Sequence, residues 1–117
     1  DSEIINFSEM PFRRIRFHVG LIYQTTPEKI LAIRKDIEEY IEKNKNLVDA
    51  KDQPSTIRVT NFNDSSIDML VNCFTKSTQW HDFCIAREEL LLEIIEIVKR
   101  NGSDFAYPTQ TIHLEKD

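Results

Sequence analysis

The residues of this sequence with the clearest potential for chemistry are a histidine and a cysteine, in the pattern His81-x-x-Cys84. On a helix this spacing places an imidazole and a thiol one turn apart. A zinc site needs three or four ligands, and the other cysteine, Cys73, falls in a predicted strand. A Cys-His nucleophile pair needs an orienting third group, and Asp82 points the wrong way around a helix. We therefore expect no metal and no catalytic residue here, and interpret Cys84 as a core residue.

A basic cluster near the start, Arg13, Arg14 and Arg16, is the second candidate. A sheet that binds nucleic acid presents aromatic side chains on which bases stack. The outward positions of the predicted strand hold Arg14, Arg16, His18 and Gly20, without an aromatic residue. The cluster is thus interpreted as a solvated strand face or a contact with a neighbouring segment. No glycine-rich phosphate loop is present, so we expect neither a nucleic-acid partner nor a cofactor.

The composition describes one domain with an acidic balance. A chain of 117 residues and 13.8 kDa, 40% hydrophobic, has room for a single core and is too apolar to be disordered. Its net charge of −5 and isoelectric point near 5.2 disfavour a general phosphate-binding surface. Two cysteines are too few for a disulfide framework, which indicates reduced thiols in a cytosolic compartment.

The sequence predicts no membrane-spanning helix and no signal peptide. A span needs about 20 apolar residues, and the richest run here, residues 90–92, is flanked by Glu89 and Glu93. No basic stretch leads into an apolar one at the start. Because the chain opens with Asp1 rather than Met, we expect it to be a piece of a longer polypeptide.

Hydrophobic periodicity gives the order of the elements. Residues 14–24 alternate as in a strand with one buried face. Thr26 and Pro27 then begin a helix, and a polar loop follows at residues 44–54. Two alternating strands, starting at Ile57 and Ile67, are joined by a short polar turn and form a hairpin. A second helix ends at Asn101 and Gly102, and residues 105–107 precede Pro108 as a last short strand.

This β-α-β-β-α-β order predicts a ferredoxin-like α+β sandwich, in which an antiparallel sheet carries two helices on one face. On the second helix we expect an apolar stripe that contains Trp80, Cys84, Arg87, Leu91, Ile94 and Val98. The core is expected to contain Ile15, Phe17, Val19, Leu21, Ile37, Ile41, Val71, Leu91, Ile94 and Ile95. Pro108 does not fit a continuous final strand, so residues 109–114 are predicted to leave the sheet.

Six short segments along nearly the whole chain match one family in the same order: IINFS at 4–8, RR at 13–14, FHVGLIY at 17–23, SSI at 65–67, REEL at 87–90 and GSDFAYPTQT at 102–111. Together they resemble the junction of the middle and carboxy-terminal cytosolic domains of small-conductance mechanosensitive channels, the MscS-type family. The last segment and the VGLIY strand at 19–23 are the most specific when taken together.

The resemblance implies a cytosolic domain of a channel subunit at the inner cell membrane. In that family seven copies form a hollow cage with side portals, and the channel opens under membrane tension and releases ions and small solutes on osmotic downshock. The cage is closed by a parallel barrel with one strand per subunit. The matching assembly residues are Pro108, Thr109, Gln110, Thr111, Ile112, His113 and Leu114. The resemblance implies no enzyme activity, no cofactor and, for this fragment, no direct insertion into the membrane.

Three segments follow from the resemblance: residues 1–12 as a remnant of the middle β-domain, 13–108 as the ferredoxin-like domain, and 109–117 as the assembly strand and tail. The family's membrane helices are missing from the sequence, so the chain alone is not expected to conduct. Two other functions remain open. A stand-alone regulatory module would bind a metabolite at a dimer interface, usually with a glycine-rich loop after the first strand. A hydrolase of acylphosphatase type would need an anion-binding loop there, which Pro27 disfavours.

Overall fold

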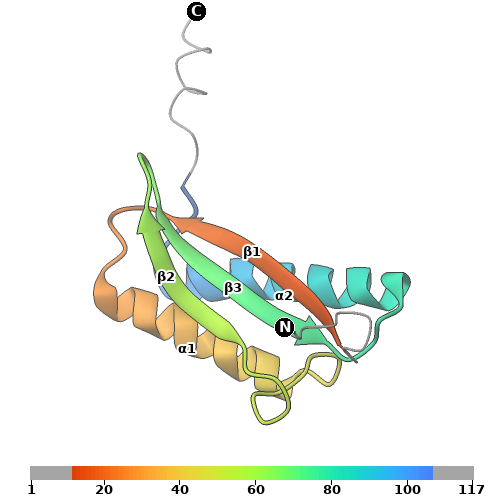
Figure 1. Cartoon of the computed structure of the whole chain (residues 1–117). Coiled ribbons are helices and arrows are strands. Elements are labelled where there is room, and N and C mark those ends of the chain that lie inside the picture. The colour runs from red at the N-terminus through yellow and green to blue at the C-terminus, as the bar shows by residue number, and fades with distance from the viewer. Residues whose placement is uncertain (1–11, 107–117) are drawn as a thin grey trace, which may run out of the picture.

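The computed structural model describes residues 12–106 and contains three strands and two helices in that range. Both helices lie on one face of the sheet, α1 under β2 and α2 under β1 (Figure 1). The predicted α+β sandwich with an antiparallel sheet is therefore confirmed. In chain order the elements are β1 (Arg13–Leu21), α1 (Pro27–Lys43), β2 (Thr56–Phe62), β3 (Ile67–Thr75) and α2 (Trp80–Arg100).

The sheet has the order β1-β3-β2, and both pairings are antiparallel. The chain thus places β3 between two strands that are joined by α1, which is the split βαβ arrangement. The predicted last strand is a single bridge within the described range, where Phe105 pairs with Leu21 on the outer side of β1. Tyr107, the last residue of the predicted strand, and Pro108, which was predicted to follow it, lie outside the described residues.

Strand β1 follows the predicted alternation. Ile15, Val19 and Leu21 are buried toward the helices, whereas Arg14 and Arg16 are exposed on the other face. This separation results from the period of two in a strand, which sends successive side chains to opposite faces. In β3 the predicted alternating residues, Ile67, Met69, Val71 and Cys73, are all buried. The interior of the domain lies between these two strands and the helices.

Helix α1 begins as its sequence predicts. The Thr26 side chain accepts a hydrogen bond from the backbone N–H of Lys29 at 3.3 Å, and Pro27 occupies the first helical position. A capping hydroxyl satisfies one of the N–H groups that a helix start leaves without a partner. Ile33, Ile37 and Ile41 are buried in the core.

Helix α2 corrects part of the predicted core. Leu91 and Ile95 are 37% and 38% exposed, so their predicted burial is wrong, and Phe17 is only half-buried. Trp80, at the start of the predicted stripe, is 59% exposed. The buried residues of α2 are Phe83, Ala86, Leu90, Ile94, Ile97 and Val98. Apolar residues cover a wider arc of this helix than the sheet and α1 can bury, and packing selected a face rotated from the predicted one.

The polar loop at residues 44–54 contains two core residues that periodicity did not reveal. Leu47 and Val48 are each 1% exposed. The backbone N–H of Val48 donates to the carbonyl of Phe74 at 2.9 Å, and Leu47 forms a bridge with Thr75. The loop therefore extends along the end of β3 and covers it, although its other residues are mostly polar.

The rotation of α2 can be tested with two leucines of the same helix. We expect Leu90→Ala, at a fully buried site, to lower the free energy of unfolding by about 2–5 kcal/mol because it leaves a cavity. Leu92→Ala, at a site that is 56% exposed, is the matched control, with an expected change of at most about 0.5 kcal/mol. Urea unfolding followed by circular dichroism measures both. Equal losses for the two variants would contradict the observed face of α2.

Candidate functional site at the two ends of the sheet

The structure does not assemble a reactive centre around His81 and Cys84. His81 is exposed at the start of α2, whereas Cys84 is half-buried and packs against the core. Within residues 12–106, no three His, Cys, Asp or Glu side chains lie close enough together to hold a metal ion. Cys84, interpreted from the sequence as a core residue, is thus only partly buried, at the edge of the core.

The second thiol, Cys73, is fully buried in the central strand. Burial in apolar surroundings raises its pKa to about 12, because desolvation disfavours the thiolate. The thiolate is the nucleophile and the metal ligand, so Cys73 is chemically inert near neutral pH in the folded chain. Its function is to fill the core.

The N-terminal corner of the domain is a contact between the first residue of β1 and the start of α2. The Arg13 guanidinium lies 5.0 Å from the ring centre of Trp80 and 4.9 Å from that of Phe83. The two rings stack on each other with their centres 5.5 Å apart. Arg13 also donates from Nη1 to the carbonyl oxygen of Thr78 at 3.3 Å. A guanidinium over aromatic faces is attracted by their quadrupoles, so this corner fixes the end of β1 to α2.

The C-terminal corner joins the loop after β1 to the segment after α2. The hydroxyl groups of Thr25 and Ser103 share a hydrogen bond at 2.7 Å, and Thr25 is 5% exposed. Lys29 donates from Nζ to the carbonyl oxygen of Gly102 at 3.1 Å. Gly102 has φ of +78°, a conformation that side chains disfavour, and this turns the chain back toward the sheet.

Beyond this turn the chain runs along the end of β1. The backbone N–H of Ile22 donates to the carbonyl of Asp104 at 3.2 Å, and that of Ala106 donates to Gly20 at 3.0 Å. The loop after β1 is therefore packed against the end of the described chain. It is not the glycine-rich, open loop that a metabolite-binding module or an acylphosphatase-type hydrolase would need there.

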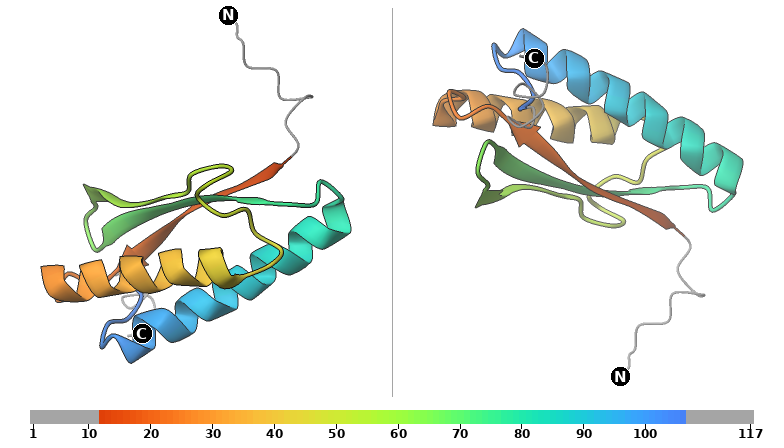
Figure 2. Two further views of the ribbon diagram at one scale, coloured as in Figure 1. Left: turned by 90° about the horizontal axis from the view of Figure 1, so that it is seen from below. Right: turned by 90° about the horizontal axis from the view of Figure 1, so that it is seen from above.

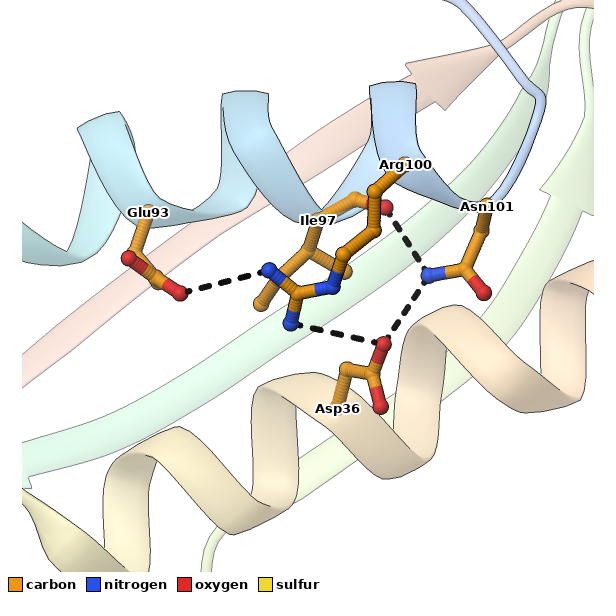
Figure 3. A network of polar contacts seen from close by, with 5 residues as sticks. All are labelled: Asp36, Glu93, Ile97, Arg100 and Asn101. Carbon is orange, nitrogen blue, oxygen red and sulfur yellow. Dashed lines mark hydrogen bonds and ion pairs between the residues drawn. The ribbon is translucent and has the colours of Figure 1, made fainter.

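A polar network fixes the end of α2 to the middle of α1 (Figure 3). Asn101 donates from Nδ2 to the Asp36 carboxylate at 3.0 Å and to the Ile97 carbonyl at 2.9 Å. Arg100 pairs with Asp36 at 3.5 Å and with Glu93 at 3.8 Å. The Asn101 amide thus caps the last turn of α2 while it binds the other helix. The network sets the point at which the chain leaves α2 for the C-terminal corner.

The two corners lie at opposite ends of β1, which runs along one edge of the sheet between them (Figure 2). Nine strand residues at about 3.3 Å each separate the corners by about 30 Å. The predicted assembly residues, Pro108 to Leu114, follow the C-terminal corner and lie outside the described residues. Within the described range, neither helix is long and apolar enough to cross a bilayer.

Comparison with known proteins gives consistent matches. The family described as "Mechanosensitive ion channel MscS, C-terminal" matches residues 15–105. The low conductance mechanosensitive channel YnaI of Escherichia coli is 36% identical over 110 residues, which is 94% of this chain and 31% of that protein. An uncharacterized MscS family protein of Aquifex aeolicus is 31% identical over 116 residues, or 99% of this chain and 31% of the relative. The chain thus spans about a third of these relatives.

Solved structures share the fold. The crystal structure of Helicobacter pylori MscS in the closed state superposes with a TM-score of 0.63 and 24% identity, covering 92% of this chain and 40% of that one. The cryo-EM structure of Arabidopsis thaliana MSL1 gives a TM-score of 0.75 at 19% identity, covering 89% of this chain and 37% of the other.

The N-terminal corner can be tested by removing its guanidinium. We expect Arg13→Ala to lower the free energy of unfolding by about 1 kcal/mol and to shift the fluorescence of Trp80, the single tryptophan of the chain. Arg16→Ala, at an exposed position of the same strand, is the control and should change the stability by at most about 0.5 kcal/mol. If both variants behave alike, Arg13 does not fix β1 to α2.

The two thiols should differ in reactivity. In the folded chain at about pH 8, we expect a disulfide reagent to label Cys84 and to spare Cys73, whose raised pKa leaves almost no thiolate. Mass spectrometry of the labelled peptides measures this, and unfolding in urea should expose both thiols. Native Cys84→Ser protein should remain unlabelled, and rapid labelling of that variant would contradict the burial of Cys73.

Proposed function

Because this chain belongs to the MscS family of mechanosensitive ion channels, we propose that it is the C-terminal cytosolic domain of a channel subunit. In this proposal seven copies form the wall of a cage on the cytoplasmic side of the membrane. The full-length channel opens under membrane tension and passes ions and small solutes on osmotic downshock. The chain has a structural, non-catalytic role in that assembly.

The observation that carries the proposal is the arrangement of the two corners. The chain enters the domain at Arg13, and its last described residue, Ala106, binds Gly20 near the other end of β1. The segment before Arg13 and the segment after Ala106 therefore leave the domain near opposite ends of β1. The contacts at both corners, and the polar network that joins the two helices next to the C-terminal corner, support a rigid spacer. A rigid spacer is what a cage wall requires between a membrane part and a closing part.

The proposed segments of the chain are residues 1–12 from the middle β-domain, 13–108 as the wall domain and 109–117 as the closing strand with its tail. A lone strand leaves backbone donors and acceptors without partners on both edges. A closed parallel ring of identical strands would satisfy both edges, and rotational symmetry would supply the copies. Alternation then places Thr109, Thr111 and His113 on one side of the ring, and Gln110, Ile112 and Leu114 on the other.

The function is tested in the full-length channel that contains this chain. In liposome patches under suction we expect a conductance that opens with tension, and in cells lacking their own tension-gated channels we expect improved survival of osmotic downshock. Deletion of residues 109–117 should reduce the yield of oligomers and the survival, because the closing ring is lost. Native mass spectrometry counts the subunits in each preparation.

A point variant separates loss of the ring from loss of chain length. Ile112→Asp keeps the length but places a charge on one side of the proposed ring, so it should weaken assembly as the deletion does. Lys116→Asp, beyond the proposed strand, is its control. Tension-independent or absent conductance of the intact protein would refute the channel function. Normal oligomers of the deletion variant would refute only the role of the strand.

A further inference from the structure

A groove of about 540 Å³ runs between the outer edge of β1 and α2, and we call it the basic groove. Phe17, Phe83 and Leu91 supply its apolar surface, and Leu91 is 37% exposed. Arginines border this surface from both elements. The lining residues that carry a guanidinium are Arg14, Arg16 and Arg87.

The strand edge along this groove offers free backbone groups. Gly20 and Ile22 direct their backbone groups to the outer side of β1, where they bind the segment at residues 104–106. Because a strand has a period of two, Arg14, Arg16 and His18 direct theirs to the same side. In the described part of the chain, the segment at residues 104–106 covers only the end of this edge, and no strand pairs with its stretch from Arg14 to His18. The groove therefore combines guanidinium groups and N–H donors with an apolar surface.

A second groove, of about 520 Å³, lies on the outer side of the two helices and is called the acidic groove. It is lined by Tyr40, Glu89, Leu92, Glu93, Ile95 and Glu96. Leu92 lies among these carboxylates and is 56% exposed. Burial raises the pKa of the Tyr40 hydroxyl and the Asn44 hydrogen bond opposes the rise, while the charges of Glu89 and Glu93 add to it. Both carboxylates thus lie close enough to the Tyr40 hydroxyl to influence it, which makes this end of the groove electronegative.

The two grooves lie on opposite sides of α2. Successive residues of a helix are about 100° apart, so Glu89 lies about 200° around the axis from Arg87, and Glu93 lies about 200° from Leu91. Arg87 and the two glutamates Glu89 and Glu96 therefore lie on opposite flanks of this helix, whereas its exposed apolar residues form a continuous arc from Leu91 through Ile95 to Leu92. Two complementary surfaces that point away from each other on one molecule cannot meet within one copy.

We propose that the basic groove of one copy binds the acidic groove of the next copy, in a head-to-tail contact between neighbouring domains. The occupant is a second copy because the same chain carries both the cationic and the anionic surface, each with exposed leucines. This inference rests on the proposed function, in which several copies assemble. A head-to-tail contact of this type closes into a ring when its rotation permits.

The chemistry of the contact follows from the side chains. Carboxylates of Glu89 and Glu96 would accept hydrogen bonds from Arg14 and Arg16, whose side chains and backbone N–H groups are donors only. Leu92 would cover the apolar surface of the basic groove and lose its exposure to water. Pairs at the border of the contact remain partly solvated, so assembly is expected to weaken as the salt concentration rises.

Charge exchange in the full-length channel tests this contact. Arg14→Glu with Arg16→Glu, or Glu89→Arg with Glu96→Arg, should each raise the concentration at which half of the subunits are assembled by at least about tenfold. All four changes in one chain should restore assembly, because each contact then has the opposite charges again. Lys51→Glu with Asp52→Lys, in the exposed loop before β2, is the matched control and should have no effect.

Cross-linking tests the direction of the contact. In a Cys84→Ser background, Arg16→Cys and Glu96→Cys in the same chain should give a ladder of disulfide-linked subunits on a non-reducing gel. Either cysteine alone should give no ladder, whereas a symmetric contact would give dimers from one of them. Arg16→Cys with Lys51→Cys is the control pair.

The outcomes separate the contact from the channel function. Unchanged assembly of both reversed variants, a failure of the fourfold exchange to restore it, or the absence of a ladder would overturn the contact. A wild-type channel that conducts under tension would keep the channel function in each of these cases. A ladder from the double-cysteine variant, together with a wild-type protein that gives no tension-gated conductance, would support the contact and refute the channel function.

Discussion

The burial of β3 between β1 and β2 is the constraint on which the rest of the domain depends. All nine residues of β1 pair with β3, and Ile57 of β2 faces Val71 from the other side. With strands on both sides, the backbone groups of β3 are satisfied and its alternating apolar residues can face the helices. An arrangement with β3 at an edge would leave the backbone donors and acceptors along one side of this buried strand without partners.

This central strand also fixes the two corners. Thr75, at the end of β3, lies beside Arg13, and Ile67, at its start, lies beside Leu21. The chain therefore has to enter at one end of β1 and continue toward its tail at the other. The polar network of Asp36, Arg100 and Asn101 adds a second constraint, since it determines where α2 stops. A domain held in this way keeps its two ends at a fixed separation, which is what the proposed role in a cage wall requires.

In helix α2 the core and the two surface grooves draw on the same apolar residues. Leu90, Leu91 and Leu92 are consecutive and equally apolar, so they point in directions about 100° apart. The core can bury only one of these directions. Leu90 occupies it, and Leu91 and Leu92 are left on the two flanks, beside arginines and glutamates respectively. The extra apolar residues of α2 made the buried face predicted from periodicity wrong. The same residues supply the apolar surface of each groove.

The sequence by itself determined the features that covalent geometry dictates locally. The alternation of Ile15, Val19 and Leu21 follows from the period of two in a strand, and the capping by Thr26 and the turn at Gly102 follow from single-residue preferences. The family resemblance can also be recognised from the sequence alone, because it depends on short motifs in a fixed order along the chain. The antiparallel sandwich with both helices on one face could be predicted for these reasons.

Only the tertiary structure decided which apolar residues form the interior. Leu47 and Val48 are buried because their loop extends along the end of β3, and no pattern within the loop indicates that neighbour. The Arg13 contact with Trp80 and Phe83 joins residues far apart in the chain, so spacing could not reveal it. The buried face of α2 depends on the position of the sheet and α1. The physical reason is that periodicity defines the faces of an element, whereas only its packed neighbours determine which face is shielded from water.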